Sequence, residues 1–139
     1  MSITAAQRQA IIQRAGGCCE YCRLGETDET SPFHVDHIVP IKHHGSDDLE
    51  NLCWSCFQCN SYKGSNRAAA DPITGKAVFL FDPRTQQWDE HFQINPDATL
   101  SGRSPEGRVT IDVLKMNDEP RVQYRQFAMS IGEYPCQKA

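Results

Sequence analysis

The 139-residue sequence lacks any apolar run near the roughly 20 residues that a membrane-spanning helix needs. Its first residues, MSITAAQRQAIIQRAGG, lack the uninterrupted apolar segment of a secretory signal. It also has no internal repeat and no low-complexity tract. We therefore expect a cytoplasmic protein without a membrane segment, whose length allows one globular domain with a modest core.

The chain also lacks a surplus of positive charge. It carries 14 Lys and Arg residues against 18 Asp and Glu residues, for a net charge of -4. This balance argues against a protein that coats nucleic acid through bulk charge. A local basic patch beside a metal site stays compatible with it, because an enzyme needs to contact only a few phosphates.

Cysteine, by contrast, is abundant. Six of the seven cysteines form two tight clusters, Cys18, Cys19, Cys22 and Cys53, Cys56, Cys59. In a reducing compartment such clusters indicate metal more often than disulfides, and an odd total fits poorly with a closed disulfide framework. Cys19-x-x-Cys22 and Cys56-x-x-Cys59 together offer four thiolates for a tetrahedral Zn²⁺.

The choice of the four ligands has alternatives. Cys53 and Cys56 also form a Cys-x-x-Cys pair, and Cys18 could replace Cys19. Some of these residues are then small buried hydrophobic side chains, which we expect for Cys18, Cys53 and Cys136. Because four thiolates fill a tetrahedral shell, the predicted Zn²⁺ would be structural and not catalytic.

A second group of polar residues lies between and just after the cysteine pairs. Asp36 offers a carboxylate oxygen and Asn60 an amide oxygen, which are ligands suited to Mg²⁺ or Mn²⁺. His37 can take a proton from water near neutral pH. Lys63 would share a helix face with Asn60 and could reach a phosphate there, and Arg67 would extend that face by one turn.

Taken in order, these motifs resemble the HNH endonuclease family. They are Cys19-x-x-Cys22, Asp36-His37-Ile38 with Pro40, Gly45, Asn51-Leu52, and Cys56-x-x-Cys59-Asn60-x-x-Lys63-Gly64. They cover residues 18–64 and run in the family's order. The resemblance implies an α+β fold with a ββα-metal module, in which two strands carry Asp36-His37 and Asn51 and a helix begins near Asn60.

The resemblance also implies a role for each residue. The histidine of the first strand is the general base in such enzymes, which implies this role for His37. The preceding residue and the late Asn or His bind one divalent cation, which implies Asp36 and Asn60, and the middle asparagine orients the base by a hydrogen bond, which implies Asn51. The implied reaction is hydrolysis of DNA. Because some members, such as the colicin nucleases, have histidine where this chain has Asn60, we expect an oxygen-preferring cation here.

Three points stay open at this level. His34 shares a strand face with Asp36 and could contact metal or phosphate. Strict alternation would place Asp36 and His37 on opposite faces, so the strand must end or bend near Pro40 for both to serve one site. The competing function is a zinc-dependent module that binds nucleic acid or protein without cleavage. Such a module has no need for Asp36, His37 and Asn60 together.

The organisation of the chain is predicted more coarsely. A helix over residues 4–15 opens a nuclease module of residues 1–70, and residues 71–139 form a β-rich extension that packs on it. The sequence of the extension predicts strands at 78–81, 99–100 and 109–113, the last two paired, and a closing helix over 119–131. We expect Phe79, Phe81, Trp88 and Phe92 in the core, and Arg103, Arg108, Arg121 and Arg125 on a solvated face.

Overall fold

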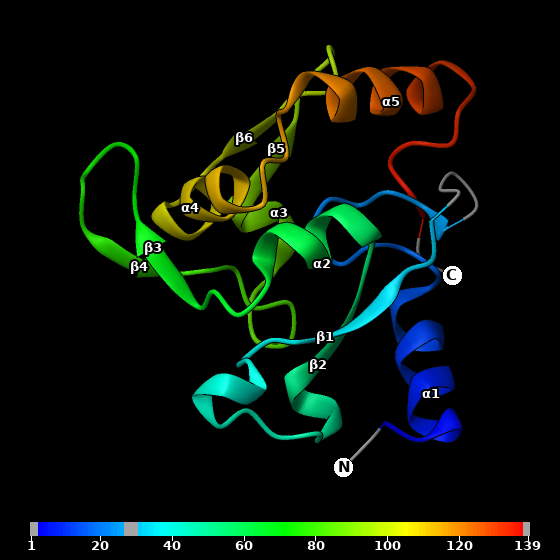
Figure 1. Ribbon diagram of the computed structural model, residues 1–139. Helices are drawn as coiled ribbons and strands as arrows, with labels where there is room; N and C mark the ends of the chain where they lie inside the picture. The colour runs from blue at the N-terminus through cyan, green and yellow to red at the C-terminus, as the bar shows by residue number, and fades with distance from the viewer. Residues whose placement is uncertain (1–2, 27–30, 138–139) are drawn as a thin grey trace.

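The computed structural model describes residues 3–26 and 31–137 and confirms the expected α+β class (Figure 1). Short helices surround three two-stranded antiparallel sheets. Among the described residues, no helix has both the length and the apolar character required to cross a membrane. The elements, in order, are α1 (Ala5–Ala15), β1 (His34–His37), η2 (Ile41–His43), η3 (Leu49–Asn51), β2 (Leu52–Ser55), α2 (Phe57–Lys63), β3 (Ala68–Ala70), β4 (Ala77–Phe79), α3 (Trp88–His91), β5 (Phe92–Ile94), β6 (Leu100–Gly102), α4 (Pro105–Val113) and α5 (Glu119–Ser130).

Helix α1 forms where the sequence predicts it, because both of its ends are specified locally. The Thr4 hydroxyl accepts from the backbone N–H of Gln7, and the Gln7 side chain accepts from the backbone N–H of Thr4, which completes a capping box. Gly16 ends the helix in the left-handed conformation. The buried face of the helix, Ile11 and Ala15, packs toward β2.

Strands β1 and β2 form the hairpin that carries the predicted site. They pair antiparallel, with Asp36 opposite Cys53 and His37 opposite Leu52. Helix α2 follows β2 and begins at Phe57, earlier than the expected start near Asn60. The reason is local, because the sulfur of Cys56 accepts from the Cys59 N–H and acts as the helix N-cap.

Among its described residues, the extension contains two more helices than its sequence predicts, α3 and α4. Residues 109–113 belong to α4 and not to a strand, since Ser104 caps this helix through the N–H of Gly107 and Pro105 occupies its first turn. Strand β6 therefore pairs with β5. The closing helix over 119–131 is confirmed as α5.

A continuous hydrophobic core joins the first 70 residues to the extension. Phe81, Trp88 and Phe92 are buried in it as expected. Phe79 is 60% exposed, which corrects its expected place in the core. It lies on the β3–β4 hairpin, where the guanidinium of Arg67 sits 4.9 Å from the centre of its ring. This hairpin also spans the expected module boundary at residues 70 and 71.

Four arginines are expected on a solvated face of the extension, and this prediction is wrong for three of them. Arg121 and Arg125 are buried, and Arg125 donates to the Ala98 carbonyl at 2.9 Å. Arg108 pairs with buried Asp71 at 2.7 Å, and this guanidinium holds the pKa of Asp71 well below its usual range. Only Arg103 of the four lies exposed. Long basic side chains therefore stabilise the interior of the extension by bonding to carbonyls and a carboxylate.

Candidate active site and thiolate centre

Four cysteine side chains meet between the first cysteine pair and the start of α2. The sulfurs of Cys19, Cys22, Cys56 and Cys59 all lie within 4.8 Å of one another and are buried. Cys22 Sγ and Cys56 Sγ are 3.8 Å apart. Sulfurs bound tetrahedrally at about 2.3 Å from a Zn²⁺ lie about 3.8 Å apart. The cluster therefore fits a metal ion, and it includes Cys19 and Cys59 and not the alternatives Cys18 and Cys53.

A buried guanidinium from α5 contacts this thiolate centre. Arg121 on α5 donates to Cys59 Sγ at 3.1 Å and to Cys56 Sγ at 3.8 Å. Burial disfavours its charged form, but the charges of Cys59, Cys22 and Cys56 outweigh burial and raise the pKa of Arg121. Four thiolates around a divalent ion carry a net negative charge, which this buried cation offsets.

Two of the three cysteines outside the thiolate centre form a disulfide. Cys18 and Cys136 are bonded to each other, which corrects the prediction that both are small buried hydrophobic side chains. The tail after α5 folds back on the first cysteine pair, where the N–H of Cys136 donates to the Arg23 carbonyl and the Tyr134 hydroxyl donates to the Cys22 carbonyl. Cys53 is a free buried thiol as expected.

Three of the predicted site residues line one open hollow beside α2. Asp36, His37 and Asn60 all line it, together with the exposed Lys42 and other residues of β1, η2 and the end of α2, and its volume is about 320 Å³. Strand β1 ends at His37, and both Asp36 and His37 are among the residues that line the hollow. Residues that carry a carboxylate, an imidazole and an amide therefore border one space that is open to solvent.

The carboxylate of Asp36 is held by a buried polar cluster. Only 5% of the residue is exposed. Its Oδ2 accepts from the Tyr21 hydroxyl at 2.7 Å and lies 3.6 Å from Cys53 Sγ. Burial and, next, the charge of Asp36 raise the pKa of Tyr21 well above its usual range, so the phenol keeps the proton that it donates.

Lys63 belongs to the same cluster, which corrects its expected contact with a phosphate. Its ammonium lies 3.1 Å and 3.3 Å from the two carboxylate oxygens of Asp36 and donates to the His37 carbonyl at 2.9 Å. The residue is 1% exposed. Lys63 does lie on α2 with Asn60 as predicted, but its side chain points toward β1 and neutralises a buried carboxylate there.

His37 is oriented by a carboxylate and not by Asn51. His37 Nε2 lies 2.7 Å from Asp47 Oδ1. Asn51 instead bonds the loop between the strands, accepting from the Val39 N–H and donating to the carbonyls of Val39 and Ser46. The expected hydrogen bond between Asn51 and the base is therefore replaced by one between His37 and Asp47, while Asn51 holds the loop that carries Asp47.

Asp47 is the site residue that the sequence does not reveal, because a partner ten residues away across a loop leaves no periodic signal. The loop reaches His37 through a close turn at Gly45. A Cβ at this position would lie 1.6 Å from the Val39 carbonyl oxygen, so the backbone approach requires glycine. The Gly45 N–H also donates to the Pro40 carbonyl at 3.0 Å.

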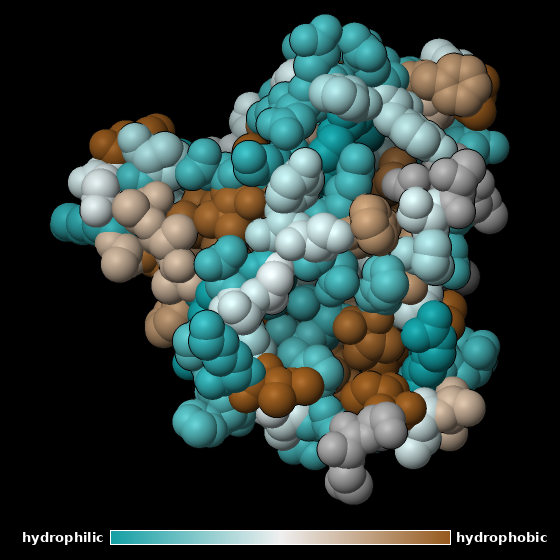
Figure 2. Space-filling model, in the orientation of Figure 1, coloured by the Kyte–Doolittle hydropathy of each residue, from teal (hydrophilic) through white to brown (hydrophobic). Residues whose placement is uncertain are grey.

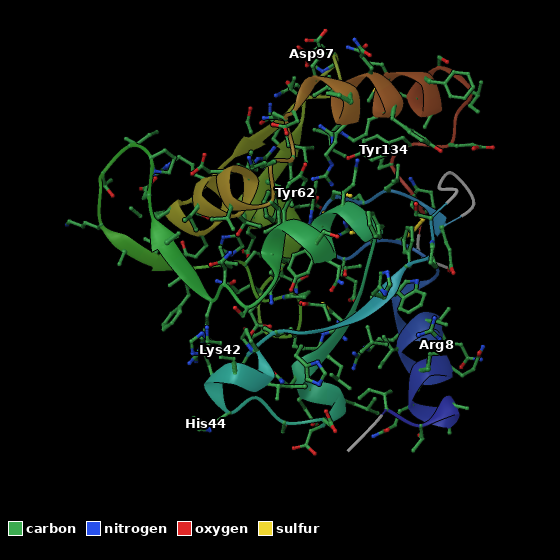
Figure 3. All side chains as sticks on the ribbon, in the orientation of Figure 1. Arg8, Lys42, His44, Tyr62, Asp97 and Tyr134 are labelled. Atoms are coloured by element: carbon green, nitrogen blue, oxygen red, sulfur yellow. A yellow bond between two sulfur atoms is a disulfide. The ribbon has the colours of Figure 1, made fainter. Side chains whose placement is uncertain are left out.

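The two other candidates lie outside the hollow. His34 packs its ring 6.1 Å from that of Phe57 and does not line the hollow. Arg67 follows the end of α2, so it does not extend the helix face as predicted, and it lines a neighbouring hollow of about 450 Å³ with Lys63. Figure 3 shows Lys42 on η2 on the side toward the β3–β4 hairpin, and His44 on the other side of η2.

Comparison with known proteins agrees with this geometry. Residues 19–66 match the family model described as HNH endonuclease, which confirms the resemblance seen in the motifs. The chain is also 26% identical over 117 residues to the Septu protein PtuB of Bacillus thuringiensis. That alignment covers 83% of this chain but only 42% of the relative, so the chain spans less than half of the relative's length.

Proposed function

We propose that the protein is a metal-dependent endonuclease that hydrolyses DNA phosphodiester bonds at the hollow between β1 and α2. The observation that carries the proposal is the convergence of Asp36, His37 and Asn60 on one open space within the segment that matches the HNH endonuclease model. Hydrophilic side chains cover most of the face shown in Figure 2, with separate apolar patches between them.

Two metal sites follow from the chemistry of the donors. The four thiolates suit a structural Zn²⁺, which leaves no open position for a substrate. Asp36 and Asn60 would hold one Mg²⁺ or Mn²⁺ through oxygen ligands. Bound there, the cation would neutralise charge on the scissile phosphate and on the leaving oxygen.

His37 would act as the general base. In the tautomer that donates from Nε2 to the Asp47 carboxylate, Nδ1 of His37 would keep a free lone pair. Nδ1 would take a proton from water as the water oxygen forms its bond to phosphorus. The bond from phosphorus to the 3′ oxygen breaks in the same displacement, and solvent protonates the leaving oxygen. The products are a 5′-phosphate and a 3′-hydroxyl.

Plasmid nicking tests the proposal directly. The zinc-loaded protein should convert supercoiled DNA to open-circle or linear forms with added Mg²⁺ or Mn²⁺, and should leave it intact without them. The competing function, a zinc-dependent module that binds nucleic acid or protein, predicts at most a mobility shift with no strand breaks in any lane. If no strand breaks appear at any Mg²⁺ or Mn²⁺ concentration, the proposed nuclease function is wrong.

Lys42 is the basic residue placed to contact a phosphate at this site. It is exposed and lines the hollow, whereas Lys63 is buried against Asp36. Lys42→Gln should weaken DNA binding without sequence preference and should reduce the slope of log affinity against log salt by about 1. A salt titration of DNA binding measures this slope. The matched variant Lys76→Gln, at an exposed position of the β3–β4 turn, should leave it unchanged.

A further inference from the structure

We infer that Tyr21 positions Asp36 for the divalent cation, so that the thiolate centre and the cation site are coupled through a single side chain. The inference rests on the proposed function, because it assumes that Asp36 binds the cation. Tyr21 would be a positioning residue, since its hydroxyl touches a ligand of the cation and not the substrate.

The contact joins two parts of the site that are far apart in sequence. Tyr21 stands between Cys19 and Cys22, two of the four thiolate ligands, and is fully buried. Its hydroxyl oxygen lies 2.7 Å from Asp36 Oδ2, which is a short hydrogen bond to a charged acceptor. The extension fixes the backbone of the same residue, because Trp88 Nε1 donates to the Tyr21 carbonyl at 2.8 Å.

The bond determines which oxygen of Asp36 is available. Oδ2 accepts from Tyr21 and also lies near Lys63 and Cys53. Among the described residues, the hydrogen bonds to Oδ1 come from Lys63 alone, at 3.3 Å. A carboxylate oxygen has two lone pairs, so Oδ1 keeps one for a cation. The terminal torsion of an aspartate is broad, so without the Tyr21 bond only Lys63 and Cys53 would restrain the orientation of the carboxylate.

The coupling follows from where Tyr21 is anchored. An ion bound by the four thiolates holds the turn from Cys19 to Cys22 in place, and with it the direction of the phenol. Loss of that ion would release the turn and leave Asp36 with Lys63 as its main partner. The thiolate centre would therefore tune the affinity of the cation site in addition to stabilising the fold.

Tyr21→Phe tests the inference because it removes only the hydroxyl. With Zn²⁺ bound by the thiolates, Mn²⁺ titrations followed by electron paramagnetic resonance should show about 10–100-fold weaker binding than in wild type. Zinc content should be unchanged, and cleavage should recover at high Mn²⁺. Tyr62→Phe is the matched control, because Tyr62 is 39% exposed on α2, and it should bind Mn²⁺ as wild type does.

The outcomes separate this inference from the proposed function. Unchanged Mn²⁺ affinity in a folded Tyr21→Phe protein overturns the inference and leaves the nuclease proposal standing. If Asp36→Asn also leaves Mn²⁺ affinity unchanged, the assignment of the cation site is wrong and both fail. Should Tyr21→Phe not fold, Trp88→Phe decides, because it keeps the hydroxyl and removes the bond to the Tyr21 carbonyl. Weaker Mn²⁺ binding with retained zinc supports the coupling, and wild-type binding overturns it.

Discussion

Replacing His37 with alanine should slow DNA cleavage by about 10²–10⁴-fold, the usual contribution of a general base. His37 lines the hollow with Asp36 and Asn60, and its Nε2 lies 2.7 Å from Asp47 Oδ1, so the variant lacks the group that we propose to accept the proton of the attacking water. Initial rates of plasmid nicking at saturating Mg²⁺ measure the effect.

The matched control is His44→Ala, since His44 is an exposed histidine of the same loop that does not line the hollow. It should cleave at nearly the wild-type rate. Both variants should retain zinc and melt near the wild-type temperature, because His37 is partly exposed and its side chain contributes little to the core. A folded His37→Ala protein that nicks as fast as wild type would remove His37 from the chemistry and require a different base.

Lys63→Met should lower the free energy of unfolding by about 3–5 kcal/mol, the range for breaking a buried ion pair on one side only. Lys63 is 1% exposed and Asp36 is 5% exposed, so the variant leaves a carboxylate in the interior without its cationic partner. It also removes the hydrogen bond to the His37 carbonyl. Urea denaturation with saturating zinc measures the loss.

Two comparisons show whether charge or packing causes this loss. Mg²⁺ or Mn²⁺ should stabilise Lys63→Met more than wild type, because a cation at Asp36 replaces part of the missing charge. The double variant Asp36→Asn with Lys63→Met should recover much of the stability, since no buried charge is left unpaired. Lys42→Met, at an exposed position, should change stability by no more than about 0.5 kcal/mol. Equal losses in the single and double variants would show that Lys63 acts through packing alone.

The sequence predicts the parts of the site that depend on neighbours along the chain. Spacing identifies the two cysteine pairs, because two thiolates three residues apart must share a tight turn. The same holds for Asp36 and His37 at the end of one strand, and for Thr4 and Gly16 at the ends of α1. In each case the information lies within about one turn of backbone.

The parts that the sequence does not predict depend on distant contacts. Lys63 is hydrophilic, and nothing local shows that its ammonium would face a buried carboxylate on another element. Residues 109–113 are rich in β-branched side chains, which favours a strand, but Ser104 and Pro105 start a helix there and the packing of α4 prevails. The disulfide between Cys18 and Cys136 depends on the path of the tail after α5.

The contact between Arg121 and the thiolates also has a consequence for how the protein is made. Arg121 follows Cys59 by 62 residues, so all four sulfur ligands leave the ribosome well before their guanidinium partner. A nascent chain can capture its ion early, yet it holds an excess of negative charge until α5 emerges and docks. Maturation of the thiolate centre would then wait for α5, which keeps a partly synthesised chain from acquiring a fully formed centre.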